Sequence, residues 1–213
     1  MSRRTVLFDF DGVIADSFNA ALATAQARCM HKTEEIYRAN FEGNIYAAKD
    51  DESLDHSQCN HDIDWFETLA SFFNENEALF AQMDDTIKHL AQDNRLVIVS
   101  SSLHSVITSF LKTHKLDTYF DAIYDAEVHN SKSEKIAMIL EKYGLTPKDC
   151  VMITDSKGDI LEAREQGVEC IAVTWGFNSY DVLASANPFR IVHVPVELPN
   201  AVTEFYHGKG TTA

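Results

Sequence analysis

The chain has 213 residues, of which 45% are hydrophobic, and a formal net charge of −15. This length allows one domain, or a core domain with a smaller insert, and the apolar content predicts a well-filled core. The negative charge argues against nucleic-acid and anionic membrane surfaces as partners, since both attract clustered lysine and arginine. No apolar stretch approaches the roughly 20 residues of a membrane span, so a cytoplasmic protein is expected.

The first part of the chain predicts one strand followed by helices. Residues 5–10 are apolar and β-prone, which indicates a short buried strand. A helix is expected over residues 17–30, with Asp16 as its candidate N-cap. The very polar stretch 48–62 predicts a loop inside this region or at its rim, and helical periodicity returns after it at 63–80 and 83–92.

After residue 94 strands and helices alternate. Strands are expected at 95–100, 120–125, 150–154 and 169–176, and helices at 105–115, 133–144 and 157–167. Continuously apolar strands that alternate with helices predict an α/β fold, in which a parallel sheet is covered on both faces. Since the first strand resembles the later ones, residues 1–16 and 86–213 are expected to form the sheet domain and 17–85 a helical insertion.

Three of the predicted strands end in acidic or hydroxyl residues. Asp9 and Asp11 follow the first strand, serines 100–102 follow the second, and Asp155 and Asp159 follow the strand at 150–154. Ligands of open parallel sheets bind beyond the carboxyl ends of the strands, so these side chains are expected to form one site. Any one of them alone could equally be a helix cap.

The spacing of the first two aspartates has a structural consequence. Adjacent side chains of a strand point to opposite faces, so Asp9 and Asp11 should share one direction while Phe10 points the other way. Gly12 follows at once, and a residue without Cβ lets the chain bend there.

The segment 131–135 offers two candidate lysines for the same site. Ser131 and Glu134 form a capping box, which places Lys132 at the first helical position, where its charge opposes the helix dipole. Lys135 lies one turn deeper, where an exposed surface lysine is normal. This misfit favours Lys132 as the functional lysine.

Together these segments resemble the haloacid dehalogenase superfamily. The pattern D-x-D-G-V-x-x-D-S at 9–17, hydrophobic residues ending in Ser100, a lysine opening a helix, and h-h-h-x-D-x-x-x-D ending at Asp159 occur in the family's order. The segment IAVTWGF at 171–177 further resembles the phosphoglycolate phosphatase-like branch. The resemblance implies a Rossmann-like, doubly wound core with a small helical cap domain inserted after the first strand.

The resemblance also implies roles for single residues. Asp9 would be the nucleophile that attacks phosphorus, and Asp11 would protonate the leaving alkoxide and then activate water. Mg²⁺ would be held by the carboxylates of Asp9 and Asp155 and the backbone carbonyl of Asp11, while Asp159 would act indirectly or through water. Thr154 stands where the family usually has glycine.

The remaining implied roles concern the phosphate. The Ser100 hydroxyl and the Ser101 N–H would hold phosphoryl oxygens, and Lys132 would neutralise the charge of the transition state. Substrate choice is usually made by the cap, where Arg38, Asn44 and Lys49 are candidates, although each could also belong to a solvated helix face.

The implied function is a Mg²⁺-dependent phosphatase acting on a small, phosphoglycolate-like phosphomonoester, as a monomer or weak homo-oligomer. A phosphomutase of the same superfamily would use the same aspartates. A non-catalytic binding or regulatory protein could keep the fold, but it would not need all of the motif residues. A dehalogenase fits least, because a departing halide does not require an acid such as Asp11.

The four cysteines have no role in the motifs described above. Cys29, Cys59, Cys150 and Cys170 lie far apart without a C-x-x-C pair, and they are expected to be core or surface thiols. His56, Cys59 and His61 offer soft ligands that a zinc ion could use, but the sequence shows no evident fourth ligand.

Overall fold

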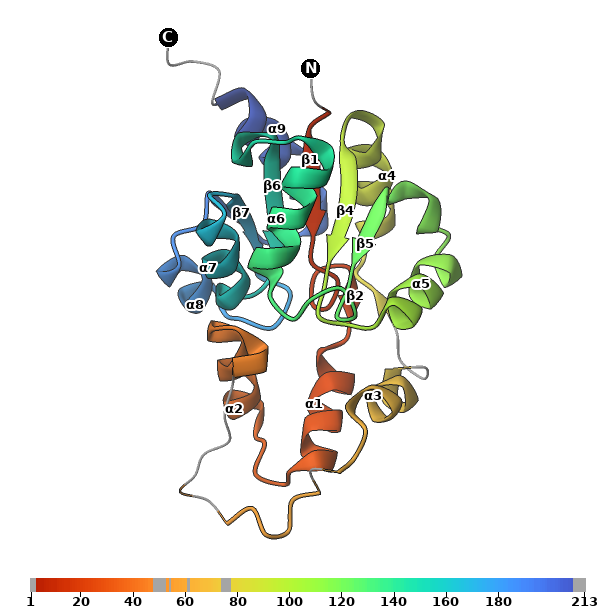
Figure 1. Cartoon of the computed structure of the whole chain (residues 1–213), viewed down its shortest axis with the longest axis vertical. Coiled ribbons are helices and arrows are strands. Elements are labelled where there is room, and N and C mark those ends of the chain that lie inside the picture. The colour runs from red at the N-terminus through yellow and green to blue at the C-terminus, as the bar shows by residue number, and fades with distance from the viewer. Residues whose placement is uncertain (1–2, 48–52, 54, 61, 74–77, 209–213) are drawn as a thin grey trace.

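The computed structural model describes residues 3–47, 53, 55–60, 62–73 and 78–208. Within this part of the chain, six parallel strands form one sheet in the order β5-β4-β1-β6-β7-β8 (Figure 1). The strands are β1 (Thr5–Phe8), β4 (Arg95–Val99), β5 (Ala122–Tyr124), β6 (Cys150–Thr154), β7 (Glu169–Val173) and β8 (Arg190–Val192). The central strands β1 and β6 are buried throughout, as their continuous apolar sequences predicted.

Helices cover both faces of this sheet. One face packs against α4 (Met83–Asp93), α5 (His104–Thr113) and α9 (Leu198–Gly208). The other face packs against α6 (Lys132–Tyr143), α7 (Lys157–Glu165) and α8 (Tyr180–Ser185). Short 3₁₀ turns at Asp117–Tyr119, Pro147–Asp149 and Pro195–Glu197 connect these elements. The expected doubly wound α/β fold is confirmed.

Three helices lie beyond the carboxyl ends of the strands (Figure 1). They are α1 (Phe18–Arg28), α2 (Glu34–Ala39) and α3 (Trp65–Phe73), with 3₁₀ turns at Asn40–Glu42 and Ile45–Ala47. A small antiparallel pair, β2 (Ala15–Asp16) and β3 (Ala78–Leu79), joins the two ends of this helical segment. Because Asp16 belongs to β2, the N-cap of α1 is Ser17 and not Asp16 as expected.

The helical segment shares its apolar packing with the sheet. Ala21 and Ala25 of α1, Tyr37 of α2 and Leu69 of α3 are buried in the same hydrophobic cluster as one face of β1. The chain then returns to the sheet at α4, whose Met83 is fully buried. The helical segment is therefore seated on the strand ends through apolar contacts.

The longest helix of the described part of the chain, α6, has 12 residues. A membrane-spanning helix needs about 20. Among the described residues, no helix is long and apolar enough to cross a bilayer.

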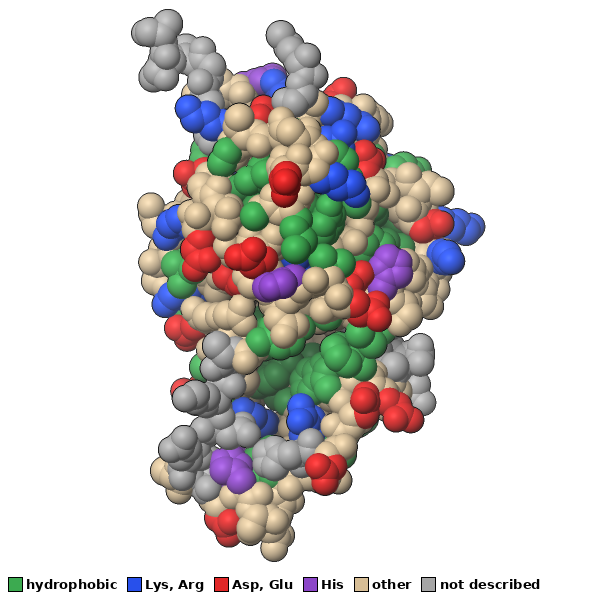
Figure 2. All heavy atoms as spheres, viewed as in Figure 1, with side chains coloured by type: hydrophobic (Ala, Val, Ile, Leu, Met, Phe, Trp, Pro, Cys, Tyr) green, Lys and Arg blue, Asp and Glu red, His purple; other side chains and the backbone are tan. Residues whose placement is uncertain are grey.

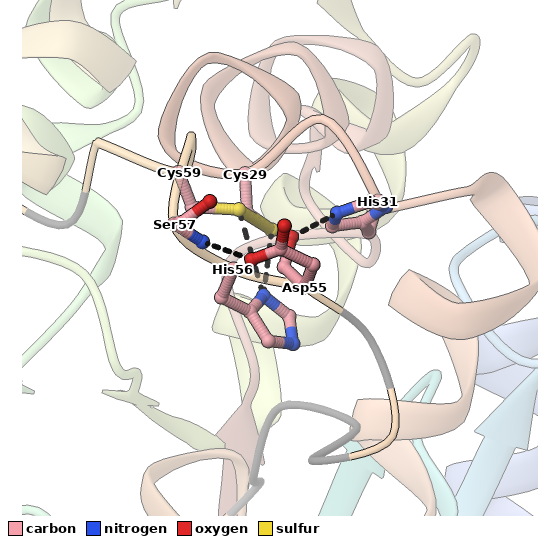
Figure 3. The surroundings of a disulfide bond; sticks show 6 residues. All are labelled: Cys29, His31, Asp55, His56, Ser57 and Cys59. Carbon is pink, nitrogen blue, oxygen red and sulfur yellow. Dashed lines mark hydrogen bonds between the residues drawn. A yellow bond between two sulfur atoms is a disulfide. The ribbon is translucent and has the colours of Figure 1, made fainter.

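Two of the four cysteines are not thiols, contrary to the sequence-based expectation. Cys29 and Cys59 form a disulfide, with their Cα atoms 4.4 Å apart (Figure 3). This pairing could not be read from the sequence, because the two residues are 30 positions apart and only the return of the 55–60 loop to the end of α1 brings them together. Cys150 and Cys170 are buried free thiols, as expected.

Candidate active site

The predicted strand-end residues gather around one pocket at the carboxyl edge of the sheet. The pocket is lined by the carboxyl groups and the lysine singled out from the sequence, namely Asp9, Asp11, Lys132, Asp155 and Asp159. Asp9 continues the pairing of β1, because its N–H donates to the Ile153 carbonyl at 2.9 Å. Phe10, between the two aspartates, is fully buried in the hydrophobic cluster, so the expected alternation holds.

Lys132 supplies the positive charge of this pocket. Its Nζ lies 2.8 Å from Asp9 Oδ1 and 2.7 Å from Asp159 Oδ2. The capping geometry explains this placement, since the Ser131 side chain accepts the N–H of Glu134 and fixes Lys132 as the first residue of α6. The structure thus brings Lys132 into the site, as the sequence predicted.

Burial governs the ionisation of these groups. Burial raises the pKa of Asp9 well above its usual value, against the opposing attraction of Lys132, and raises the pKa of Asp155 to about 7. Burial acts in the same direction on Asp159, but Lys132 and hydrogen bonds outweigh it and hold the pKa of Asp159 below its usual range. Burial alone would lower the pKa of Lys132, yet Asp159 and Asp9 raise it.

The donor set fits a divalent metal ion. Several carboxyl groups face a single lysine, so the pocket carries more acidic than basic groups, and a hard cation would offset the difference. Among the described residues, no three carboxylates of this pocket come within 4.8 Å of one another. Mg²⁺ is usually held by one or two carboxylates, with water and substrate oxygens completing its shell.

Thr154, where the family usually has glycine, takes part in the hydrogen bonding of the site. Its Oγ1 donates to Asp159 Oδ2 at 2.6 Å and also accepts the N–H of Ser156 at 3.2 Å. Ser156 caps α7 and accepts the N–H of Asp159. The departure from the family pattern therefore orients Asp159 toward Lys132.

Two glycines leave the space that Asp155 occupies. Asp155 Oδ2 accepts the N–H of Phe177 at 2.6 Å. A Cβ atom at Gly12 would lie 2.1 Å from this oxygen, and one at Gly176 would lie 2.2 Å from it. Gly12 also has a φ of 73°, which side chains disfavour. The glycine after the second aspartate is thus required by both backbone conformation and close packing.

The serine loop after β4 differs in detail from the expectation. Ser100 is fully buried, and its Oγ accepts the N–H of Ser102 at 2.9 Å. Ser101 and Ser102 line the pocket, and the Ser102 hydroxyl donates to Asp11 Oδ2 at 2.6 Å. This contact ties the loop to Asp11, a role that the sequence did not indicate beyond the run of three serines.

Lys135 is not a surface lysine, which corrects the expectation from its helical position. Its side chain is fully buried, and Nζ donates to the Ser100 carbonyl at 2.5 Å. Burial lowers the pKa of Lys135 to about 8, and the neighbouring charge of Lys132 acts in the same direction. Because α6 packs against the sheet, a residue one turn into the helix faces the serine loop rather than solvent.

The three substrate candidates of the helical segment lie in different places. Asn44 lines the pocket and donates to Glu162 Oε1 at 2.9 Å. Arg38 does not line it, because its guanidinium donates to the backbone carbonyls of Gly176 and Phe177. Lys49 lies outside the described residues.

Glu162 of α7 is a pocket residue that sequence reasoning missed. Its Oε1 accepts from the Ser131 hydroxyl at 2.9 Å and from the Lys132 N–H at 3.1 Å, besides the contact with Asn44. It therefore joins the start of α6 to the helical segment. Its sequence position, three residues after Asp159 on the same helix, was the available signal.

The fold and the site define an α/β protein whose acidic groups converge at the carboxyl edge of a parallel sheet. A family model described as haloacid dehalogenase-like hydrolase matches residues 6–173. The chain belongs to this family, which confirms the resemblance of its motifs.

Curated relatives carry the names of phosphatases. The chain is 30% identical over 109 residues to a phosphoglycolate phosphatase of Synechococcus elongatus, a match that covers 51% of each protein. It thus matches about half the length of that relative. It is 27% identical over 197 residues to a 5′-nucleotidase of Pseudomonas aeruginosa, which covers 86% of this chain and 88% of the relative. These names support the expected enzyme class, a phosphoric monoester hydrolase.

Solved structures agree on the fold. A haloacid dehalogenase-like hydrolase from Streptococcus pneumoniae aligns with a TM-score of 0.71 at 23% identity. The alignment covers 92% of this chain and 97% of the other.

Proposed function

We propose that the protein is a Mg²⁺-dependent phosphatase that hydrolyses a small phosphomonoester through an aspartyl-phosphate at Asp9. The observation that carries this proposal is the contact between Asp9 and Lys132 at 2.8 Å, beside Asp155 in one buried pocket. A carboxylate that attacks an anionic phosphate needs nearby positive charge, and this contact supplies part of it.

Asp9 is held in the orientation of a nucleophile. Its Oδ1 accepts the N–H of Phe10 at 2.8 Å and the ammonium of Lys132. Two donors on one oxygen fix the plane of the carboxylate, so attack on phosphorus needs little reorganisation. The same ammonium would neutralise charge that spreads over the phosphoryl oxygens in the transition state.

Asp11 is suited to acid and base steps. Burial raises its pKa, while the hydrogen bond from the Ser102 hydroxyl lowers it in part. A raised pKa increases the fraction of Asp11 that carries a proton for the leaving alkoxide. Once it has given that proton away, the carboxylate can take one from the water that attacks the aspartyl-phosphate.

The metal-binding residues of the proposal are the carboxylates of Asp9 and Asp155 and the backbone carbonyl of Asp11. Mg²⁺ bound there supplies positive charge that reduces the repulsion between the Asp9 carboxylate and the phosphate. Burial raises the pKa values of Asp9 and Asp155, and a bound cation would favour the charged forms of both carboxyl groups.

The dimensions of the pocket support a small substrate. Its volume is about 90 Å³, well below the roughly 300–1,000 Å³ of sites for drug-sized ligands. A neighbouring pocket of about 400 Å³ shares Tyr37, Trp65 and Ser101 with it and is also lined by Arg28 and Lys32. A phosphoglycolate phosphatase among the relatives supports a small, phosphoglycolate-like substrate for this site.

The helical segment acts in this proposal as a cap, with residues 17–85 as cap and 1–16 and 86–213 as core. Figure 2 shows this face hollowed between the two parts, with hydrophobic side chains inside and lysine and arginine side chains at the lower margin. Asn44 contacts Glu162 of α7 across this boundary, and Arg38 contacts the loop after β7. These contacts would close the pocket against water during the reaction.

The test is a phosphatase screen over small phosphomonoesters that includes 2-phosphoglycolate and nucleoside 5′-monophosphates, with and without Mg²⁺. Phosphate release should need the metal and should vanish in Asp9→Asn. Asp181→Asn, an exposed position on α8, is the matched control and should keep the parent rate. Turnover by Asp9→Asn at the parent rate would overturn the proposal. Steady release without an added bisphosphate would separate a phosphatase from a phosphomutase.

A further inference from the structure

A second group of metal-ligating side chains lies away from the carboxylate pocket, in the helical segment. Cys29 follows the last residue of α1, and His56 and Cys59 belong to the loop that returns to it (Figure 3). The two Sγ atoms and Nδ1 of His56 all lie within 4.8 Å of one another. The sequence had suggested soft ligands in this loop but had not brought Cys29 to them.

We propose that Cys29, His56 and Cys59 bind Zn²⁺ when the disulfide is reduced. The distances from His56 Nδ1 are 3.4 Å to Cys29 Sγ and 3.5 Å to Cys59 Sγ. A tetrahedral zinc ion with bonds of about 2.3 Å to sulfur and about 2.0 Å to nitrogen places these atoms about 3.5 Å apart. Two edges of the coordination tetrahedron are therefore already formed, and only the two sulfurs have to separate.

The backbone holds the three ligands in place independently of the disulfide. The N–H of Asn60 donates to the Arg28 carbonyl at 2.8 Å, which joins the loop to the end of α1. The N–H of Cys59 donates to the His56 carbonyl at 2.9 Å, which sets the turn between these two ligands. Reduction of the disulfide therefore leaves the thiols beside the imidazole.

The ligand chemistry selects zinc over magnesium. Thiolate and imidazole are ligands for soft and borderline ions, whereas Mg²⁺ requires oxygen ligands. Among the described residues the site offers three protein ligands, and His61, which the sequence also suggested, lies outside them. Cys59 and His56 are only partly buried, so a fourth ligand could come from water. His31 packs edge-on to His56, and its Nε2 donates to the Asp55 carbonyl at 2.8 Å, so it lies beside the set rather than in it.

The metal and the disulfide exclude each other. A small dithiol reduces the Cys29–Cys59 bond to two thiols and is itself oxidised to a cyclic disulfide. Each thiol then loses one proton as it binds Zn²⁺, and His56 binds through neutral Nδ1. The two thiolates balance the charge of the ion. Because one thiolate comes from the end of α1 and the other from the loop, the bound ion also cross-links the reduced loop to α1.

The experiment compares reduced and oxidised full-length protein loaded with Co²⁺, a spectroscopic substitute for Zn²⁺. Reduced protein should show the thiolate-to-cobalt charge-transfer band and take up about one Zn²⁺ per chain at this site. The oxidised protein should show no such band. Because the band reports thiolate coordination alone, a metal bound to the carboxylates of the active site does not contribute to it.

Variants assign the ligands. Cys59→Ser should abolish the band, and His56→Ala should weaken metal affinity at least tenfold. Cys170→Ala and His89→Ala, at a buried free thiol and an exposed histidine of α4, should leave it unchanged. Absence of the band in reduced protein would overturn the proposal, as would its persistence in Cys59→Ser. An unchanged metal affinity in His56→Ala would show that His56 is not a ligand. Oxidised parent protein provides a comparison that needs no substitution.

Discussion

Lys132 Nζ lies 2.8 Å from Asp9 Oδ1, although α6 and β1 are separated by more than half of the chain. Lys132 is 4% exposed and Asp9 is 6% exposed, so the pair is shielded from water. Asp159 shares the same ammonium at 2.7 Å. One cation thus compensates two buried carboxylates, and the ionisation of the whole site depends on it.

Replacement of Lys132 by Met should affect both stability and activity. It leaves Asp9 and Asp159 without their cation, which should cost about 3 kcal/mol of unfolding free energy. Phosphatase activity should fall at least about 100-fold, because the transition state loses a charged donor. Urea unfolding and phosphate release measure the two effects. The double variant Lys132→Met/Asp159→Asn should recover part of the stability but not the activity. A Lys132→Met protein as stable as the parent would contradict this account.

The pH profile should respond to Ser102→Ala. The Ser102 hydroxyl donates to Asp11 and favours its charged form, so its loss should raise the pKa of Asp11 further. A general acid is active while protonated, so kcat/KM declines as pH rises through its pKa. In the variant this declining limb of the profile should move to higher pH. Ser105→Ala, at an exposed position of α5, should not move this limb. A shift of the limb to lower pH would refute the assignment.

Lys135 should make stability depend on pH in the alkaline range. Its pKa is about 8 in the folded protein and 10.5 without the surrounding structure. Between these values the unfolded chain binds more protons than the folded one, so Lys135 makes the parent more stable as pH rises. Below pH 8 Lys135 is charged in both states, so the cost of burying its charge in the folded protein is fully present. In Lys135→Met this rise should disappear, as measured by urea midpoints just below pH 8 and at about pH 10. Lys142→Met, at an exposed position of α6, should keep it.

Gly158→Ala should separate the helical segment from the sheet. A Cβ atom at Gly158 would lie 2.1 Å from the Gly43 carbonyl oxygen, so α7 and the 3₁₀ turn could not keep their contact. Because the atom that the Cβ would meet belongs to the backbone of the turn, the turn has to move, and the thermal midpoint should fall as well. We expect KM to rise about tenfold. Gly208→Ala, whose Cβ would meet nothing within 4 Å, is the control, and an unchanged KM in Gly158→Ala would show that this contact does not shape the pocket.

The sequence by itself determined the sheet and indicated which acidic residues and which lysine lie together at its carboxyl edge. Apolar runs indicated the buried strands, and the capping box at Ser131 placed Lys132 at a helix start. These signals are local: a cap needs only its own backbone, and a parallel sheet brings strand ends to one edge whatever the rest of the chain does. They therefore sufficed to gather the acidic residues and one lysine.

Only the tertiary structure decided the contacts made across long separations. The burial of Lys135 under the Ser100 carbonyl, the role of Glu162 and the pairing of Cys29 with Cys59 depend on how helices and loops approach one another. Hydrophobic periodicity shows which face of a helix is apolar, but it does not show which elements pack against the helix. That depends on the shapes of all the elements together. For that reason Lys135 looked like a surface residue in the sequence and is buried in the fold.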